Sequence, residues 1–284
     1  MAILPVSALS LSDSLHLNSS FYPSIISFSA LDAMILAAGL GTRLRPITDT
    51  IPKALIPVGG VPMLERVARR LIAAGATQLV VNVHHHAGQI EAFLRERHGF
   101  GVHVSISDES DGVLETGGGL LHAAPFFRRD APFFLHTADV LSDCDLRAVY
   151  RFHQEQQGGA LATLVVNNRP ATRYFLFDDD GLCGHGNDAT GVVRHAREPI
   201  GQLRAMSFCG IHVIAPRIFE LITERGKFSI VDLYLRLAAD GHRLLPYDSS
   251  GCLWIDIGKP EQLQRAEAMV AAATPAAGSS EENS

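Results

Sequence analysis

A glycine-containing loop with two nearby basic residues is the part of the sequence best suited to phosphate chemistry. Gly39 and Gly41 follow a short apolar run, and Arg43 and Lys53 come soon after them. Glycines let backbone N–H groups approach an anion without a Cβ in the way, and successive N–H groups in such a turn form a concave anion site. Because the two basic side chains add full positive charges, this stretch predicts a loop that covers a polyphosphate.

Two better-known glycine loops do not match this stretch. A dinucleotide fingerprint needs a glycine three positions after Gly41, where the chain has Leu44, and Pro46 blocks the helix that should begin there. A Walker A loop needs G-x-x-x-x-G-K-[ST], and the sequence has no such run. A nicotinamide-dependent oxidoreductase is also disfavoured because no acidic residue ends the predicted second strand.

Two other segments contain residues that could either bind a ligand or have a purely structural role. Asp139 closely follows an apolar run at 132–136, and open α/β sheets bind their ligands beyond the carboxyl ends of strands. An aspartate in that place can also be a turn or helix-capping residue. Likewise, Thr116 in the run Glu-Thr-Gly-Gly-Gly at 115–119 could cap a helix. The residues alone leave these alternatives open.

Two clusters of potential metal ligands are assigned other roles. The histidines at 84–86 are consecutive at a strand end, so His84 and His86 share a side but lack an obvious third ligand. The aspartates at 178–180 precede Gly181 between two predicted hairpin strands. We interpret the histidines as a polar strand-end cluster and the aspartates as solvated turn residues.

The order of predicted elements indicates the fold class. From residue 33 onward, apolar runs typical of strands alternate with segments of helical periodicity, which predicts an α/β fold with a doubly wound, mostly parallel mixed sheet. The predicted strands are 33–38, 78–83, 102–107, 132–136, 160–166, 173–177, 204–213 and 251–257. The predicted helices are 62–74, 87–97, 115–124, 146–156, 216–223, 230–240 and 261–271.

The bulk properties exclude several classes of protein. The chain has 284 residues, of which 47% are hydrophobic, and a formal charge of -6. An acidic chain argues against a nucleic-acid partner or an anionic membrane surface. The four cysteines lack zinc-ligand or redox spacing, and no apolar run is long enough to span a membrane. We expect a cytoplasmic location with reduced thiols.

The two ends of the chain differ from the rest. Residues 1–32 contain no Lys or Arg and resemble neither a secretory signal nor a transit peptide. We expect them to be a disordered extension, with a targeting or docking segment as the alternative. Residues 33–273 are predicted to form one domain, followed by a polar tail at 274–284.

The segment 36–53 reads LAAGLGTRLRPITDTIPK, and it resembles the sugar-1-phosphate nucleotidyltransferases, also called nucleotide-sugar pyrophosphorylases. Trp254, Asp256 and Gly258 match the W-x-D-[IV]-G that ends the catalytic domain in that family. The resemblance implies a Rossmann-like nucleotidyltransferase fold. It also implies the reaction of an NTP with a sugar 1-phosphate to give an NDP-sugar and pyrophosphate.

The resemblance implies a role for each matching residue. Arg43 and Lys53 would be the catalytic side chains, and Asp139 and Asp256 would hold a catalytic Mg²⁺. The residues implied to bind the nucleotide are Leu36, Ala37, Ala38, Gly39, Gly41, Thr42, Arg43, Lys53, Glu115, Gly117 and Gly118. The residues implied to contact the sugar are Gly118, Glu198 and Gly210.

The sequence departs from the family pattern at two places. The family usually has N-G-D where this chain has Thr137-Ala138-Asp139, although the aspartate is kept. Many relatives carry Glu-Lys-Pro near the sugar phosphate, whereas this chain has Arg-Glu-Pro at 197–199. The lysine of that motif is therefore absent, or is replaced by Arg194 or Arg197.

The sequence of the glycine run at 115–119 and the absence of the Glu-Lys-Pro lysine most resemble the pattern of N-acetylmuramate-1-phosphate uridylyltransferases. UTP with N-acetylmuramate 1-phosphate or a related hexose 1-phosphate is therefore the expected substrate pair, and a mannose-1-phosphate guanylyltransferase is the alternative. A catalytically silent nucleotide-sugar-sensing subunit is an alternative of another class. The resemblance is compatible with a homo-oligomer.

Overall fold

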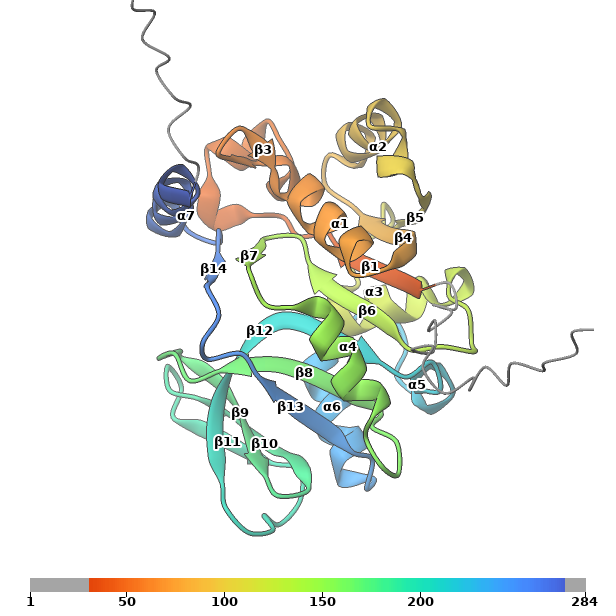
Figure 1. Ribbon diagram of the computed structural model, residues 1–284, viewed down its shortest axis with the longest axis vertical. Helices are drawn as coiled ribbons and strands as arrows, with labels where there is room; N and C mark the ends of the chain where they lie inside the picture. Colours follow the sequence, from red (N-terminus) through yellow and green to blue (C-terminus); the bar gives the residue numbers. More distant parts are fainter. Residues whose placement is uncertain (1–30, 274–284) are drawn as a thin grey trace, which may run out of the picture.

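The computed structural model describes residues 31–273, and a mixed sheet forms its centre (Figure 1). Strand β1 (Leu31–Leu36) lies between β4 (Ala76–Val83) and β6 (Phe133–Thr137) and is parallel to both. Strand β5 (His103–Asp108) extends the parallel part beyond β4. After β1 the chain forms β4 and β5 on one side of this strand and later β6 on the other side. The strand order therefore reverses at β1, and open α/β sheets bind their ligands at the carboxyl end of such a switch point.

An antiparallel part adjoins this parallel core through one long strand. Strand β12 (Arg204–Ile214) pairs with β6, β8 and β9, and its pairing with β8 shifts register between Phe208 and His212. Strand β13 is parallel to β8, and β9, β10 and β11 form an antiparallel extension. The bounds are Ala162–Asn167 for β8, Arg173–Asp178 for β9, Gly181–Asn187 for β10, Val192–His195 for β11 and Leu244–Asp248 for β13.

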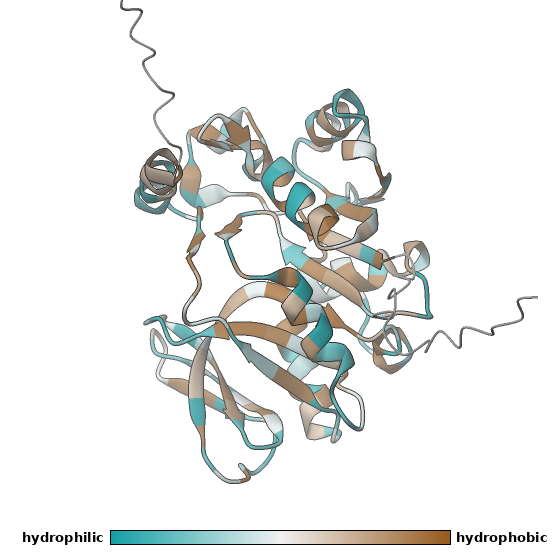
Figure 2. Cartoon of the chain, in the orientation of Figure 1, coloured by the Kyte–Doolittle hydropathy of each residue, from teal (hydrophilic) through white to brown (hydrophobic). Residues whose placement is uncertain are grey.

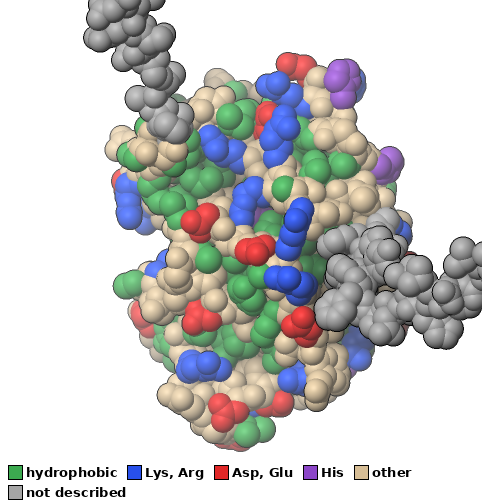
Figure 3. Space-filling view, in the orientation of Figure 1, with side chains coloured by type: hydrophobic (Ala, Val, Ile, Leu, Met, Phe, Trp, Pro, Cys, Tyr) green, Lys and Arg blue, Asp and Glu red, His purple; other side chains and the backbone are tan. Residues whose placement is uncertain are grey.

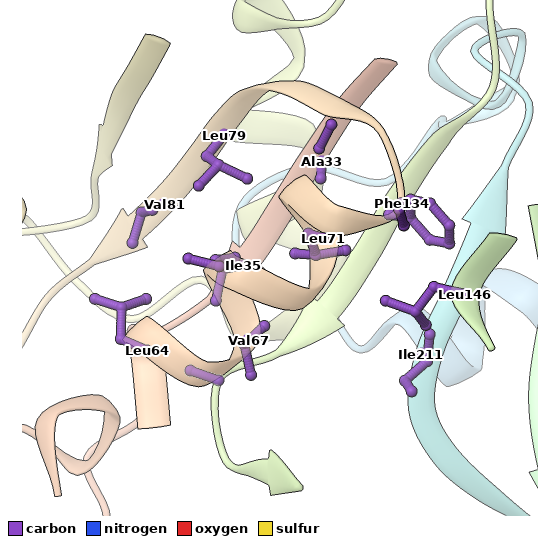
Figure 4. Close-up of a cluster of buried hydrophobic side chains, with 14 of the residues drawn as sticks. Ala33, Ile35, Leu64, Val67, Leu71, Leu79, Val81, Phe134, Leu146 and Ile211 are labelled. Carbon is purple, nitrogen blue, oxygen red and sulfur yellow. The ribbon is translucent and has the colours of Figure 1, made fainter. Parts of the chain in front are cut away.

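Helices cover both faces of the sheet because neighbouring strand residues point to opposite sides. Ala33 and Ile35 of β1 pack in one buried cluster, and Met34 packs in another. Figure 4 shows the first cluster, and Figure 2 shows the apolar central strands. The helices that contribute to the first cluster are α1 (Met63–Ala73), α2 (Ala87–Glu96) and α4 (Leu146–Gln154). Those that contribute to the second are α3 (Glu115–His122), α5 (Ile218–Leu221) and α6 (Ile230–Ala239).

A third buried cluster joins the start of the domain to its end. We call it the Leu44 cluster, and its members are Leu44, Ile56, Val58, Met63, Ile255, Ile257 and Ala266. The cluster draws on the hairpin β2 (Pro57–Val58) and β3 (Val61–Pro62), on β14 (Trp254–Asp256) and on α7 (Pro260–Ala273). Figure 1 places α7 beside that hairpin, where Glu267 Oε2 accepts the Gly59 N–H at 2.7 Å. The phosphate-loop segment and the C-terminal strand are thereby fixed against each other.

The structure confirms the predicted doubly wound, mostly parallel mixed sheet and corrects details. Strand β13 was not predicted. Pro46 was expected to block a helix after the glycine loop, and the segment there forms only the short 3-10 turns η1 (Thr42–Leu44), η2 (Ile47–Asp49) and η3 (Lys53–Leu55).

The first strand begins two residues earlier than predicted. Leu31 and Asp32 are buried in β1, and the Asp32 carboxylate accepts the Arg128 backbone N–H at 2.9 Å. Residue 32 therefore belongs to the folded unit. The expectations for residues 1–30 and for the tail at 274–284 lie outside the described residues.

One member of the three-aspartate turn is not solvated as predicted. Asp178 is 2% exposed, and both of its carboxylate oxygens accept hydrogen bonds from Arg197, at 2.6 and 2.7 Å. Burial raises the pKa of Asp178, but the hydrogen bonds from Arg197 and nearby backbone N–H groups lower it strongly. A turn pattern cannot reveal a partner that lies nineteen residues away, on the far side of a hairpin.

Within residues 31–273, none of the helices has the length and apolar character needed to cross a bilayer. Figure 3 shows basic side chains interspersed with acidic ones on the face that it presents.

A buried histidine makes the stability of this fold depend on pH. His153 of α4 is 5% exposed, its Nδ1 lies 3.0 Å from Thr163 Oγ1, and burial lowers its pKa from 6.5 to about 4. Between these values the unfolded chain binds more protons than the folded chain. The contribution of neutral His153 to the free energy of unfolding is fully present above pH 6.5. It is lost as the pH falls toward 4.

We predict that wild-type protein loses roughly 2 kcal/mol of unfolding free energy through this histidine between pH 7 and pH 5. The variant His153→Gln keeps a group that can bond Thr163 but does not titrate, so its loss over the same pH range should be smaller by that amount. Urea unfolding at both pH values measures the difference. Equal losses in the two proteins would contradict the assignment.

Candidate active site

A small cavity of about 210 Å³ opens at the carboxyl end of β1. It collects many of the residues predicted to bind the nucleotide or the metal: Leu36, Ala37, Ala38, Gly39, Lys53, Glu115 and Asp139. The cavity therefore brings together segments that are more than 100 residues apart in the chain, at the place where strand order reverses.

The ion pair of Lys53 and Asp139 lies in this cavity. Lys53 Nζ donates a hydrogen bond to Asp139 Oδ2, and the two side chains are 14% and 26% exposed. Burial raises the pKa of Asp139, but the charge and hydrogen bond of Lys53 lower it more, so that the net pKa is below its ordinary value. The carboxylate is therefore ionised at neutral pH, and a cation is already held beside it.

A buried polar network that the sequence did not predict shapes the same cavity. Asn82 Oδ1 accepts the Ala37 N–H at 2.7 Å, and Asn82 Nδ2 donates to Glu109 Oε1 at 2.7 Å. Glu109 Oε2 in turn accepts the Leu114 N–H at 3.0 Å. These bonds tie the loops after β1 and β5 to the start of α3. The available signal was Asn82 itself, a polar residue near the end of an apolar strand.

The glycine run of α3 packs against another part of the chain. Gly117 and Gly118 do not line the small cavity, and both donate their N–H groups to Phe228 O, at 3.0 and 3.2 Å. A Cβ on Gly117 would lie 2.5 Å from the Phe228 ring, and one on Gly118 would lie 2.4 Å from Gly226 O. The structure thus gives these glycines a packing role, and their contact with a nucleotide stays a prediction.

Thr116 does not cap its own helix. It lies inside α3, and its Oγ1 accepts the N–H of Ile230, the first residue of α6, at 2.9 Å. Glu115, one residue earlier, is exposed and lines the small cavity. The start of α3 therefore serves both the cavity and the packing of α6.

The two glycines of the first loop have different roles. At Gly41, φ is +64°, and a Cβ would lie 2.8 Å from Thr48 Cγ2, so both conformation and space require glycine. At Gly39 a Cβ would meet nothing within 4 Å, and φ is not in the left-handed region. The fold does not require a glycine at 39, which lines the cavity, so the absence of a Cβ there suits close approach of a ligand.

Arg43 and Asp256 meet on the other side of this loop. A Cβ on Gly258 would lie 2.7 Å from Asp256 Oδ1 and 2.9 Å from Arg43 Nη2, so both side chains rest against that glycine. Asp256 Oδ1 also accepts the Gly258 N–H at 2.8 Å. Gly258, the last residue of the W-x-D-[IV]-G motif, thus leaves space for the side chain of Arg43 as well as for that of Asp256.

Asp139 immediately precedes one strand, and Asp256 ends the strand that pairs with it. Strand β14 is antiparallel to β7 (Val140–Ser142), with Asp256 opposite Val140, and the Ile257 N–H donates to Asp139 O at 3.0 Å. Asp139 lines the small cavity, and Asp256 lines a larger cleft next to it. The backbone pairing brings the two residues close together, and their side chains line different spaces.

These two carboxylates suit Mg²⁺, which takes one or two protein carboxylates when substrate phosphates and water complete its shell. Among residues 31–273 no group of three or more His, Cys, Asp or Glu side chains could hold a metal ion alone. His84 has a different role, because its Nδ1 lies 2.7 Å from Glu109 O. The donor set thus fits a cation that is bound together with phosphates.

The larger cleft has a volume of about 1330 Å³ and lies between β14, α7 and the antiparallel extension of the sheet. Its lining includes the aromatic side chains Tyr174, Phe175, Phe208 and Trp254. It also includes the basic side chains Arg43, Arg169, Arg173, Lys259 and Arg265. An aromatic, basic cleft suits a sugar that carries anionic groups.

The residues predicted to contact the sugar do not line this cleft. Gly210 is buried with φ +75°, and a Cβ there would lie 2.5 Å from Thr137 Oγ1, so it lets β12 pass the end of β6. Glu198 is exposed, and Arg194 and Arg197 donate to Asp232 and Asp178, each at 2.6 Å. A sugar contact at Glu198 or Gly210 stays a prediction. The two arginines have carboxylate partners.

The fold is that of a nucleotidyltransferase. Residues 32–273 match the model of the family described as nucleotidyl transferase, and the chain belongs to this family. Relatives are sugar-1-phosphate nucleotidyltransferases. The chain is 34% identical to an N-acetylmuramate alpha-1-phosphate uridylyltransferase of Caulobacter vibrioides, over 85% of this chain and 97% of the relative.

Two further comparisons agree with this assignment. An N-acetylmuramate alpha-1-phosphate uridylyltransferase of Neisseria meningitidis is 32% identical over 85% of this chain and 99% of its own length. Among solved structures, a UDP-glucose pyrophosphorylase of Acinetobacter baumanii superimposes with a TM-score of 0.68. That comparison covers 87% of this chain and 95% of the other at 20% identity, and it supports the fold alone.

Gly258 provides a test of the contact between the two ends of the domain. We predict that Gly258→Ala lowers turnover of the enzyme at least about tenfold, because the new Cβ displaces the flexible ends of Arg43 and Asp256. Stability should change little, since both groups can move. Gly251→Ala is the matched control, because a Cβ there meets nothing within 4 Å. Equal turnover in both variants would contradict this role for Gly258.

Proposed function

We propose that this protein transfers a nucleotidyl group from an NTP to a sugar 1-phosphate in a Mg²⁺-dependent reaction that releases pyrophosphate. The observation that carries the proposal is the cavity at the end of β1, where Lys53 and Asp139 face the glycine loop. The larger cleft offers room for a sugar phosphate, and Asp256 lines it from the strand that pairs with Val140, next to Asp139.

UTP and N-acetylmuramate 1-phosphate are the substrates that we propose. The two relatives from Caulobacter vibrioides and Neisseria meningitidis, both matched over almost their whole length, carry this activity in their names. A mannose-1-phosphate guanyltransferase of Candida albicans is 29% identical, but the match covers 62% of that protein. A silent sensing subunit is disfavoured because Lys53, Asp139 and Asp256 are all present.

The reaction places like charges together, and this determines what the residues must do. The sugar phosphate oxygen bonds to the α-phosphorus as the bond to the pyrophosphate leaving group breaks. Two unit charges 4 Å apart repel by about 4 kcal/mol at an effective dielectric constant of 20. Catalysis therefore depends on positioning and charge neutralisation, and no side-chain nucleophile is needed.

Lys53 and the loop divide this task. Lys53 donates to Asp139 and lies in the cavity, so it can bind the α-phosphate while it stays near the carboxylate. Arg43, beside Gly258, binds the β- and γ-phosphates together with the backbone N–H groups near Gly39. Asp139 and Asp256 would hold Mg²⁺, which supplies further positive charge on the phosphates. A preorganised set of cations thereby stabilises the charge of the transition state.

A pyrophosphate-release assay tests the proposal. Four NTPs are each combined with N-acetylmuramate, N-acetylglucosamine, glucose and mannose 1-phosphates in the presence of Mg²⁺. We expect the fastest release with UTP and N-acetylmuramate 1-phosphate. Release with GTP and mannose 1-phosphate alone would favour the guanylyl alternative, and no release with any pair would contradict an enzymatic function.

We predict that Lys53→Ala lowers turnover at least about 10²-fold, which corresponds to about 3 kcal/mol of transition-state stabilisation. The reason is the loss of the one ammonium group that lines the small cavity among the described residues. Arg45→Ala is a suitable control, because Arg45 is 65% exposed and its one ion pair within residues 31–273 is with Asp49 of the same segment. Unchanged turnover of Lys53→Ala would remove this lysine from the mechanism.

Asp139 provides a separate test of the metal. We predict that Asp139→Asn raises the Mg²⁺ concentration needed for half-maximal pyrophosphate release by at least about tenfold, because an amide is a weaker Mg²⁺ ligand than a carboxylate. The fold should persist, since the side chain is 26% exposed and lies in a cavity. Wild-type activity with an unchanged Mg²⁺ dependence would rule out Asp139 as a ligand.

A further inference from the structure

The larger cleft carries more positive charge than a phosphate monoester requires. Five basic side chains line it, and Asp256 is the single acidic residue among its described lining residues. Arg43 lies next to Asp256 and belongs to the phosphate side. Arg169 belongs to another part of the cleft, at the turn that leads from β8 to β9. The function of Arg169 was not predicted from the sequence.

The guanidinium of Arg169 is held in one orientation from several sides. Its centre lies 3.5 Å from the centre of the Trp254 ring, which is a close cation–π contact. Nη1 donates to Asn167 Oδ1 at 2.6 Å, and Nη2 donates to Phe208 O at 2.7 Å. Trp254 is fixed in turn, because its Nε1 donates to Cys209 O at 2.9 Å. The arginine is thus preorganised.

Two donors of this fixed group are free. A guanidinium has five N–H groups. In the described part of the chain, Nη1 donates to Asn167 and Cys209, one N–H of Nη2 donates to Phe208, and the Nε N–H has no partner. One Nη2 N–H and the Nε N–H therefore remain available, and free N–H groups of a guanidinium are strong donors to a carboxylate.

Asp256 of the same cleft acts on the charge of Arg169 from a distance, without forming an ion pair with it. None of the ion pairs within residues 31–273 includes Arg169, whereas Arg194, Arg197 and Arg236 each have a carboxylate partner. Burial lowers the pKa of Arg169, and the smaller opposing effects of Cys209 and Asp256 do not offset it. A half-buried, oriented cation with free donors suits an anionic ligand group.

The position of Arg169 separates its ligand group from the reacting phosphate. Trp254 and Asp256 are two residues apart in β14, so they lie on one side of the strand and roughly 7 Å apart along it. The phosphates react beside Asp256, and Arg169 stacks on Trp254. A group that reaches Arg169 is therefore about one pyranose ring away from the anomeric phosphate.

We propose that Arg169 binds a carboxylate carried on the sugar ring and thereby selects acidic sugar 1-phosphates. This inference rests on the proposed function, and it identifies the residue that determines sugar specificity. A neutral sugar would leave the free N–H groups of this half-buried cation without acceptors, which is the situation in which sites discriminate most strongly.

Two substrates that differ in one substituent provide the test. N-acetylmuramate 1-phosphate is N-acetylglucosamine 1-phosphate with a lactate ether on O3, so the pair isolates the carboxylate. The measurement is kcat/KM for each sugar with saturating UTP and Mg²⁺. We expect the wild type to prefer the carboxylated sugar by at least about 10²-fold. Arg169→Gln should reduce this preference to less than about fivefold, mainly through loss with the carboxylated sugar.

Two further variants sharpen the result. Arg169→Lys keeps the positive charge but loses the planar set of N–H donors. It should therefore retain part of the preference that Arg169→Gln loses. Arg265→Gln removes another cation that lines the same cleft, from α7, and should leave the ratio of the two sugars unchanged. A loss of preference in Arg265→Gln as large as that in Arg169→Gln would overturn the assignment to Arg169.

The outcomes separate this inference from the proposed function. Equal losses of kcat/KM for both sugars in Arg169→Gln would mean that Arg169 binds the phosphate or has a structural role, and would overturn the inference while nucleotidyl transfer stands. A wild type that uses both sugars equally well would do the same. A wild type that releases no pyrophosphate with any sugar would instead contradict the proposed function.

Discussion

The site depends on a small apolar contact that holds the two ends of the domain together. Leu44 follows Arg43 directly, Ile255 and Ile257 flank Asp256, and all three apolar side chains are buried in the Leu44 cluster. Burying a side chain of this size contributes roughly 1.5–3 kcal/mol relative to exposure. Charged groups that would remain solvated and far apart in an open chain are thereby placed against each other. Without this apolar contact, the packing would not hold Arg43 of the first loop beside Asp256 of the last strand.

The same contact explains how a charged site is maintained in an acidic protein. The net charge of the chain is -6, yet the larger cleft collects five basic side chains. Lys53 has Asp139 as its partner, and Arg43 lies beside Asp256. Each acid that suits a metal ion thus keeps a basic residue close by. The positive potential is local, and it is positioned by packing rather than by the average composition.

Much of the fold could be predicted because its determinants are local. The apolar runs of the parallel strands and the periodicity of α1 and α6 are visible in short windows of sequence. The loop residues from Leu36 to Lys53 were found through a dense pattern, and the structure brings many of them to one cavity. Strand β13 was missed because its identity depends on pairing with β8, which lies far away in the chain.

Other properties of the site depend on long-range contacts and could not be predicted. Glycines at 39 and 41 look equivalent in the sequence, but only the neighbouring Thr48 shows that the second is required for packing. Thr116 was open to interpretation as the cap of α3, yet it accepts a hydrogen bond from the first turn of α6. Arg169 had no signal at all, because its orientation depends on Trp254, eighty-five residues later.

The most direct test of the account is a crystal structure of the protein with UTP and Mn²⁺, in which anomalous scattering locates the metal. The account predicts an anomalous peak at ligand distance from both Asp139 and Asp256, with the triphosphate over residues 39–43 and Lys53 at the α-phosphate. A nucleotide bound outside the cavity at the end of β1, or a metal that contacts neither aspartate, would contradict it.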